Sequence, residues 1–145
     1  MSRARDVSFA AASVLFGATW LFAAGAKVSA PMPAYEFLAH AVPPGLAAKS
    51  VFVAGVAAES LLGSLMLLRA IAPMRAFALS LAGLAAACAL LLDVRSKADG
   101  LLQCGCYGHV FFSSIDGELV LNASMAAILI ALLVWGRLTR SRAAA

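Results

Sequence analysis

The amino-acid sequence predicts an all-α membrane protein, a polytopic bundle of four transmembrane helices. The chain has 145 residues, of which 63% are hydrophobic and only 12% are charged, and its mean hydropathy is +0.95. Soluble domains carry about 25% charged residues. The apolar residues gather in runs long enough to cross a bilayer. Because a backbone in lipid must satisfy its own hydrogen bonds, each run is expected to be a helix.

Four runs meet this criterion, and charged residues bound each of them. Within the runs the only charged residue is Glu59, in the second. We expect no cleavable signal peptide, and no internal repeat or linker is evident, so we expect a single domain over residues 1–145. The expected spans cover residues 7–26, 50–68, 76–92 and 119–136.

The first long loop, between the first and second spans, contains a further helical segment. Pro31 and Pro33 are expected to break the chain, and the following AYEFLAHAV (residues 34–42) favours a short helix. Pro43, Pro44 and Gly45 then end it. We expect this helix to lie on the membrane surface or to cap the bundle.

The distribution of Lys and Arg predicts the orientation. Four spans place both termini on one side, and basic residues near span ends mark the cytoplasmic side. We therefore expect cytoplasmic termini in a bacterial inner membrane, with the loops of residues 27–49 and 93–118 facing the periplasm. The net charge of +4 is then a topology signal, and without a basic-aromatic patch we expect membrane lipid and no nucleic acid as a partner. The termini side holds Arg3, Arg5, Arg69, Arg75, Arg137, Arg140 and Arg142, and the opposite side holds Lys27, Lys49, Arg95 and Lys97.

Two of the three cysteines lie in the second long loop, in LLQCGCYGHV (residues 101–110). Disulfides persist in the oxidising periplasm. A bond between Cys104 and Cys106 closes a very small ring, which Gly105 permits by its backbone freedom. Such a ring is strained and therefore labile, which suits exchange. His109 is a candidate to stabilise a thiolate or to accept its proton, and otherwise a solvated loop residue.

The cysteine pair leaves three functions open. We favour thiol–disulfide exchange with a partner protein, over a structural disulfide that shapes the loop and over capture of a soft metal such as Cu(I) or Hg(II). Cys88 lies near the outer end of the third span. It is either a relay thiol for the pair or a small hydrophobic residue in the packing.

Glu59 lies within a span, where an ionisable group is costly and indicates either a functional site or a buried pair. Its expected partner is Lys27, provided that the first helix continues past the lysine or the side chain bends inward. Asn122 is a second polar candidate. The pair serves either helix packing or proton handling near a quinone headgroup or the thiols. Gly55, Ala58 and Gly63 are expected to allow close helix approach.

Three segments resemble the methylamine-utilisation MauE family, within the DoxX-like group of four-helix membrane proteins. These are LFAAGAKVSAP after residue 20, AGVAAESLLGSLML in the second span and CGCYG in the outer loop. The resemblance runs from about residue 15 to residue 136. It implies that the protein makes or maintains disulfides in exported proteins together with a thioredoxin-like partner; in the methylamine system the client is the small subunit of methylamine dehydrogenase. The residues that match the family pattern are Lys27, Glu59, Cys104, Gly105, Cys106 and Gly108.

The architecture is also similar to that of quinone-linked thiol oxidases of the DsbB and vitamin K epoxide reductase type. Those proteins carry a C-x-x-C and a second cysteine pair, whereas this chain has one C-x-C and the lone Cys88. A quinone is therefore a candidate electron acceptor and not a required cofactor. We expect a membrane thiol–disulfide oxidoreductase whose candidate residues are Cys104, Cys106, His109, Cys88, Glu59 and Lys27.

Overall fold

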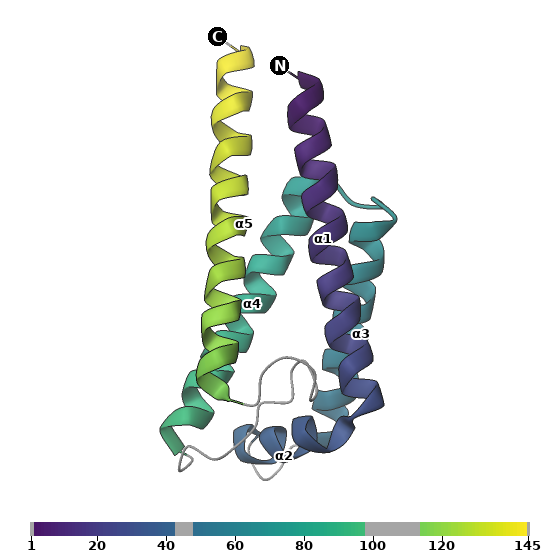
Figure 1. Cartoon of the computed structure of the whole chain (residues 1–145), viewed down its shortest axis with the longest axis vertical. Helices are drawn as coiled ribbons and strands as arrows, with labels where there is room; N and C mark the ends of the chain where they lie inside the picture. The colour runs from purple at the N-terminus through teal and green to yellow at the C-terminus, as the bar shows by residue number, and fades with distance from the viewer. Residues whose placement is uncertain (1, 43–47, 98–113, 145) are drawn as a thin grey trace.

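The computed structural model describes residues 2–42, 48–97 and 114–144, and all secondary structure in these ranges is helical (Figure 1). Both termini lie at one end of the bundle, and the short helix α2 lies across the other end. The helices in chain order are α1 (Ser2–Ser29), α2 (Pro31–Ala41), α3 (Ala48–Leu67), α4 (Pro73–Lys97) and α5 (Ile115–Ala144).

Four helices, α1, α3, α4 and α5, are long and apolar enough to cross a membrane, as the sequence predicted. Their candidate spans contain 24, 20, 25 and 25 residues. At a rise of about 1.5 Å per residue even the shortest covers the hydrocarbon core. All four helices extend past the apolar runs into a charged flank, α3 only at its start, where it includes Lys49. The helices are longer than the expected spans because a helix that leaves the membrane can continue in water, where polar side chains are tolerated.

The turns are short, and local sequence sets them. The sequence suggested that Pro31 breaks the chain, but Pro31 is the first residue of α2. A proline is tolerated in the first turn of a helix because the N–H that it lacks would have no partner there. After α3, Arg69 has a φ of 54°. The N–H of Ala70 donates to Leu65 O at 3.0 Å, and that of Arg69 donates to Met66 O at 3.2 Å. This pair of bonds is a Schellman motif that caps α3.

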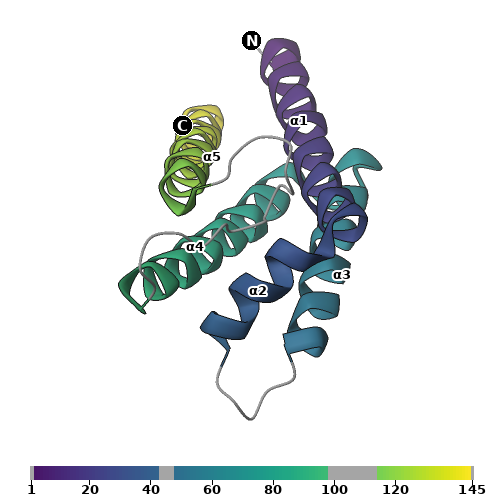
Figure 2. The same ribbon diagram turned by 60° about the horizontal axis from the view of Figure 1, so that its bottom comes forward.

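The long helices pack as two pairs, α1 with α3 and α4 with α5. Gly17 and Gly63 lie at the α1–α3 crossing, where a Cβ on Gly63 would come within 2.9 Å of Gly17 O. Gly63 therefore has the role that the sequence predicted. Gly55 does not, because a Cβ added there would meet nothing within 4 Å. Figure 2 shows α2 running beside α3 and α4 at the end of the bundle, which is the capping position.

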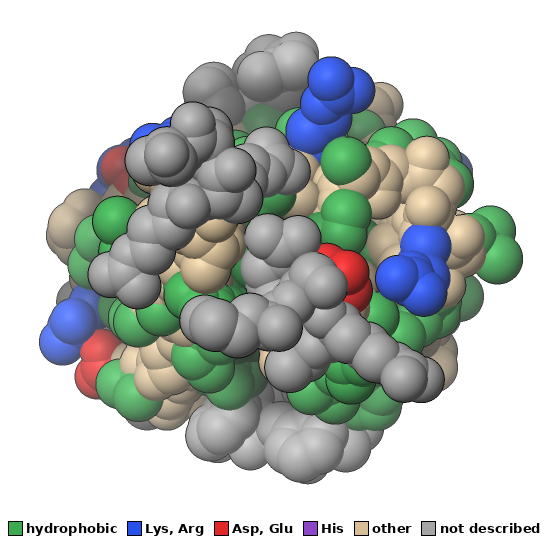
Figure 3. Space-filling model, turned by 90° about the horizontal axis from the view of Figure 1, so that it is seen from above, with side chains coloured by type: hydrophobic (Ala, Val, Ile, Leu, Met, Phe, Trp, Pro, Cys, Tyr) green, Lys and Arg blue, Asp and Glu red, His purple; other side chains and the backbone are tan. Residues whose placement is uncertain are grey.

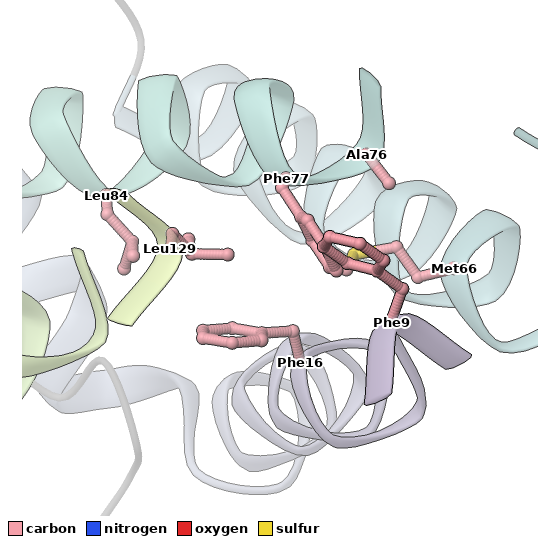
Figure 4. Packing of buried hydrophobic residues seen from close by; sticks show 7 residues of the cluster. All are labelled: Phe9, Phe16, Met66, Ala76, Phe77, Leu84 and Leu129. Carbon is pink, nitrogen blue, oxygen red and sulfur yellow. The ribbon is translucent and has the colours of Figure 1, made fainter. Parts of the chain in front are cut away.

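The core joins the two pairs near the end that carries the termini. Figure 4 shows its residues converging from α1, α3, α4 and α5. The ring centroid of Phe77 lies 5.9 Å from that of Phe9 and 6.4 Å from that of Phe16. Apolar contact thus holds this end closed. The cluster consists of Phe9, Phe16, Met66, Ala76, Phe77, Leu84 and Leu129.

The charged residues differ between the two ends. Arg69, Arg75 and Arg137 are exposed at the termini end, and Lys and Arg side chains stand at the rim in the view from above (Figure 3). At the α2 end, Arg95 lies 3.2 Å from Asp116 and Lys97 lies 2.6 Å from Asp93. The basic residues of this end are thus largely neutralised by carboxylates.

Candidate functional site

Lys27 and Glu59 form an ion pair between α1 and α3. The Lys27 Nζ atom lies 2.7 Å from Oε1 and 2.8 Å from Oε2 of Glu59. The two side chains are 13% and 19% exposed. Helix α1 continues past Lys27 to Ser29, as the predicted contact between Lys27 and Glu59 required. The expected pairing is confirmed.

The chemistry of the pair follows from its surroundings. An isolated charge in an apolar interior is strongly destabilising, and a close opposite charge offsets most of that penalty. A pair with both carboxylate oxygens engaged also fixes the rotation of α1 against α3. The geometry therefore supports a role in packing and leaves an ammonium and a carboxylate side by side within a membrane-spanning bundle.

The ion pair lines a partly open cavity of about 200 Å³ between the two helix pairs, beneath α2. Most of its wall is hydrocarbon, and residues of all five described helices line it. Trp20 forms part of the wall, and its indole N–H donates to Ser80 Oγ at 3.1 Å. The other wall residues include Ala34, Phe37 and Leu38 of α2, Val51, Phe52, Gly55 and Val56 of α3, and Leu84, Ala87, Leu90 and Leu91 of α4.

Asn122 of α5 is the third polar residue of this wall. Its residue exposure is 3%, and within the described part of the chain its side chain makes no hydrogen bond. It therefore does not pair with Glu59, although the two residues line the same cavity. The cavity wall therefore presents an amide whose hydrogen-bonding groups are open to a ligand.

Glu118, one turn before Asn122, is a buried carboxylate that the sequence did not reveal. It is 0% exposed, whereas its position next to the fourth apolar run suggested a boundary charge in water. One signal was present: Glu118, Asn122, Met125 and Leu129 recur at helical spacing of four, three and four residues. That stripe identifies one face of α5 as the interior face.

The described cysteine, Cys88, is unbonded and half-buried on α4. Its neighbour Ala87 lines the cavity, but Cys88 itself does not. Cys104, Cys106 and His109, the predicted exchange pair and its neighbour, lie outside the described residues. Arg95 and Lys97, in the last turn of α4, have carboxylate partners.

The fold and the site define a polytopic membrane protein, a helical bundle with an ion pair buried between its spans. The family model of the methylamine utilisation protein MauE matches residues 5–136. This match covers most of the chain, which therefore belongs to the MauE family. The comparisons with curated proteins and with solved structures find no match.

Proposed function

We propose that this protein is a thiol–disulfide oxidoreductase of the bacterial inner membrane, working on exported proteins. The observation that carries the proposal is the Cys104–Gly105–Cys106 sequence inside the family match. It belongs to the segment between the end of α4 and the start of α5, and both of those helix ends lie at the α2 end of the bundle (Figure 1). With cytoplasmic termini, this segment faces the periplasm.

The chemistry is two successive exchanges. A thiolate of a thioredoxin-like partner attacks one sulfur of the Cys104–Cys106 disulfide, forms a mixed disulfide and releases the other sulfur as a thiolate. The partner's second thiolate then attacks the mixed bond. The partner leaves as a disulfide, and Cys104 and Cys106 are left as a dithiol. The same steps run in reverse when the partner is the oxidant, so the relative reduction potentials set the direction.

Trapping of the mixed disulfide tests this proposal. One of the two cysteines forms the mixed disulfide and the other resolves it, so either Cys104→Ser or Cys106→Ser removes the resolving sulfur. That variant should accumulate a covalent adduct with the partner in native membranes. The adduct should be visible on a non-reducing gel and lost with reductant. Cys88→Ser is the matched control, because it keeps both loop cysteines and should accumulate none. Absence of an adduct from both loop variants would contradict exchange.

The reduction potential of the Cys104–Cys106 pair separates exchange from a purely structural bond. Structural disulfides of exported proteins have potentials below about −300 mV, whereas strained exchange disulfides lie higher. We expect a value above this limit in titration against glutathione, with alkylation of the free thiols as the readout. A lower value would instead indicate a loop-shaping disulfide in a scaffold protein.

A further inference from the structure

We propose that the cavity between the two helix pairs binds the neutral ring of a lipid-soluble quinone. Three observations on different helices converge on it: a mostly hydrocarbon wall, an ion pair of Lys27 with Glu59, and the buried amide of Asn122. All three are features of a site that holds an apolar ring and orients it by a few polar groups.

The size of the cavity fits one ring. A cavity of about 150 Å³ lined by aliphatic and aromatic side chains holds a benzene molecule, and the cavity here has about 200 Å³. The additional volume accommodates carbonyl oxygens and small ring substituents. The indole of Trp20 is fixed in the wall by its bond to Ser80, and the aromatic side chains of Phe37 and Phe52 complete an apolar surface.

The polar groups match both redox forms of such a ring. An ammonium has three N–H donors, and the Glu59 carboxylate takes two from Lys27. The third N–H and the Asn122 amide are donors for quinone carbonyls, while the remaining lone pairs of Glu59 accept from the hydroxyls of the quinol. The ion pair has no net charge. It therefore does not attract an anionic lipid head, and a carboxylate or phosphate would meet Glu59.

The hydrocarbon tail has an exit beside Gly55. This residue lines the cavity, is exposed on α3, and has nothing within 4 Å of an added Cβ. Since Gly55 lies within a membrane-length helix, this opening faces the region of the lipid tails. A ring held at Lys27 can thus keep its tail in the bilayer.

The role of the quinone rests on the proposed function. Oxidation of the Cys104 and Cys106 thiols to the disulfide releases two electrons and two protons, and a quinone that accepts both becomes the quinol. Binding itself requires no exchange, so the two proposals can fail separately.

The test measures quenching of Trp20 emission by decylubiquinone in full-length protein in nanodiscs. A Trp135→Phe background leaves Trp20 as the reporter. We expect saturable quenching, weakened at least tenfold in apparent affinity by Gly55→Leu, which fills the opening, and severalfold by Asn122→Leu. Gly25→Leu is the matched control, because Gly25 is also exposed with nothing within 4 Å of an added Cβ but does not line the cavity.

The Cys104→Ser, Cys106→Ser double variant should bind decylubiquinone as the parent does, whether or not exchange occurs. Oleate, which has an anionic head, should not displace the quinone. Linear, non-saturable quenching, equal affinities of the Gly55→Leu and Gly25→Leu variants, or displacement by oleate at comparable concentration would each overturn the proposal. Circular dichroism checks that every variant is folded.

Discussion

At the scale of single residues, three polar side chains in an apolar bundle account for the site. Lys27 and Glu59 satisfy each other at 2.7 Å, and their mutual attraction offsets a desolvation penalty that neither would tolerate alone. Asn122 has no such partner among the described residues. Each charge of the pair therefore depends on the other, while the lone amide is available for recognition.

Removing one member of the pair should destabilise the protein more than removing both. Lys27→Met leaves Glu59 in a low-dielectric interior, and we expect the free energy of unfolding to fall by about 3 kcal/mol. Lys27→Met with Glu59→Leu leaves no charge and should recover most of this loss. Unfolding in detergent, followed by circular dichroism, measures both.

Lys97→Met is the control for that comparison. Lys97 and Asp93 both lie on α4 and form an exposed ion pair. Such a pair contributes only about 0.3–0.5 kcal/mol to the free energy of unfolding. A double variant as unstable as Lys27→Met alone would show that the two charges are not energetically coupled.

At the scale of helices, close contact between α1 and α3 depends on two glycines. Carbonyl oxygens of Gly17 and Gly63 face the positions where side chains would otherwise start. In a membrane the hydrophobic effect does not drive helices together, because lipid tails are as apolar as the helices. The close approach at the two glycines instead stabilises the α1–α3 pair by van der Waals contacts. The tight α1–α3 pair then holds Lys27 opposite Glu59.

We expect Gly63→Ala to weaken the α1–α3 contact. The added Cβ would lie 2.8 Å from Leu21 Cγ and 2.9 Å from Gly17 O, and relief of the second contact requires a backbone shift. Overpacking of this kind costs about 1–3 kcal/mol, measurable as a lower midpoint of thermal unfolding. Gly55→Ala, on the same helix in open space, should be neutral or slightly stabilising because alanine favours the helix. Equal midpoints for the two variants would contradict this account.

At the scale of the whole molecule, the bundle has two chemically different ends. Exposed arginines mark the termini end, whereas Arg95 and Lys97 at the α2 end are paired with carboxylates. The termini end also holds more Lys and Arg than the α2 end, seven against four, and this excess predicts that the termini lie in the cytoplasm. The helix ends that flank residues 98–113 then lie on the opposite side.

Labelling with a membrane-impermeant maleimide tests this orientation. In a background without native cysteines, Lys49→Cys should react in intact spheroplasts, whereas Ser141→Cys should react only after lysis. Both positions are exposed, so accessibility to reagent is matched. The reverse pattern would place the proposed exchange pair in the reducing cytosol and contradict its function.

Hydropathy and charge predicted the spans and the ion pair because each is a local requirement. Twenty apolar residues must be a helix in lipid, and a carboxylate such as Glu59 needs a nearby cation. The cavity could not be predicted in this way. In a membrane bundle, residues facing lipid are as apolar as those facing the core: Leu61 is 62% exposed and Leu84 is 2% exposed. Hydrophobic periodicity therefore says little about how the two helix pairs separate.

The single residue Ala30 joins α1 to α2, and this short link has a kinetic consequence. Helix α2 covers the cavity, is attached closely to the long helix α1, and packs its Phe37 against α4 and α5. It therefore has little freedom to move aside toward the aqueous phase. A ligand would then enter and leave the cavity beneath α2 laterally, between the helices. The occupancy of the cavity would depend on the mole fraction of the ligand in the bilayer and hardly on the solubility of the ligand in water.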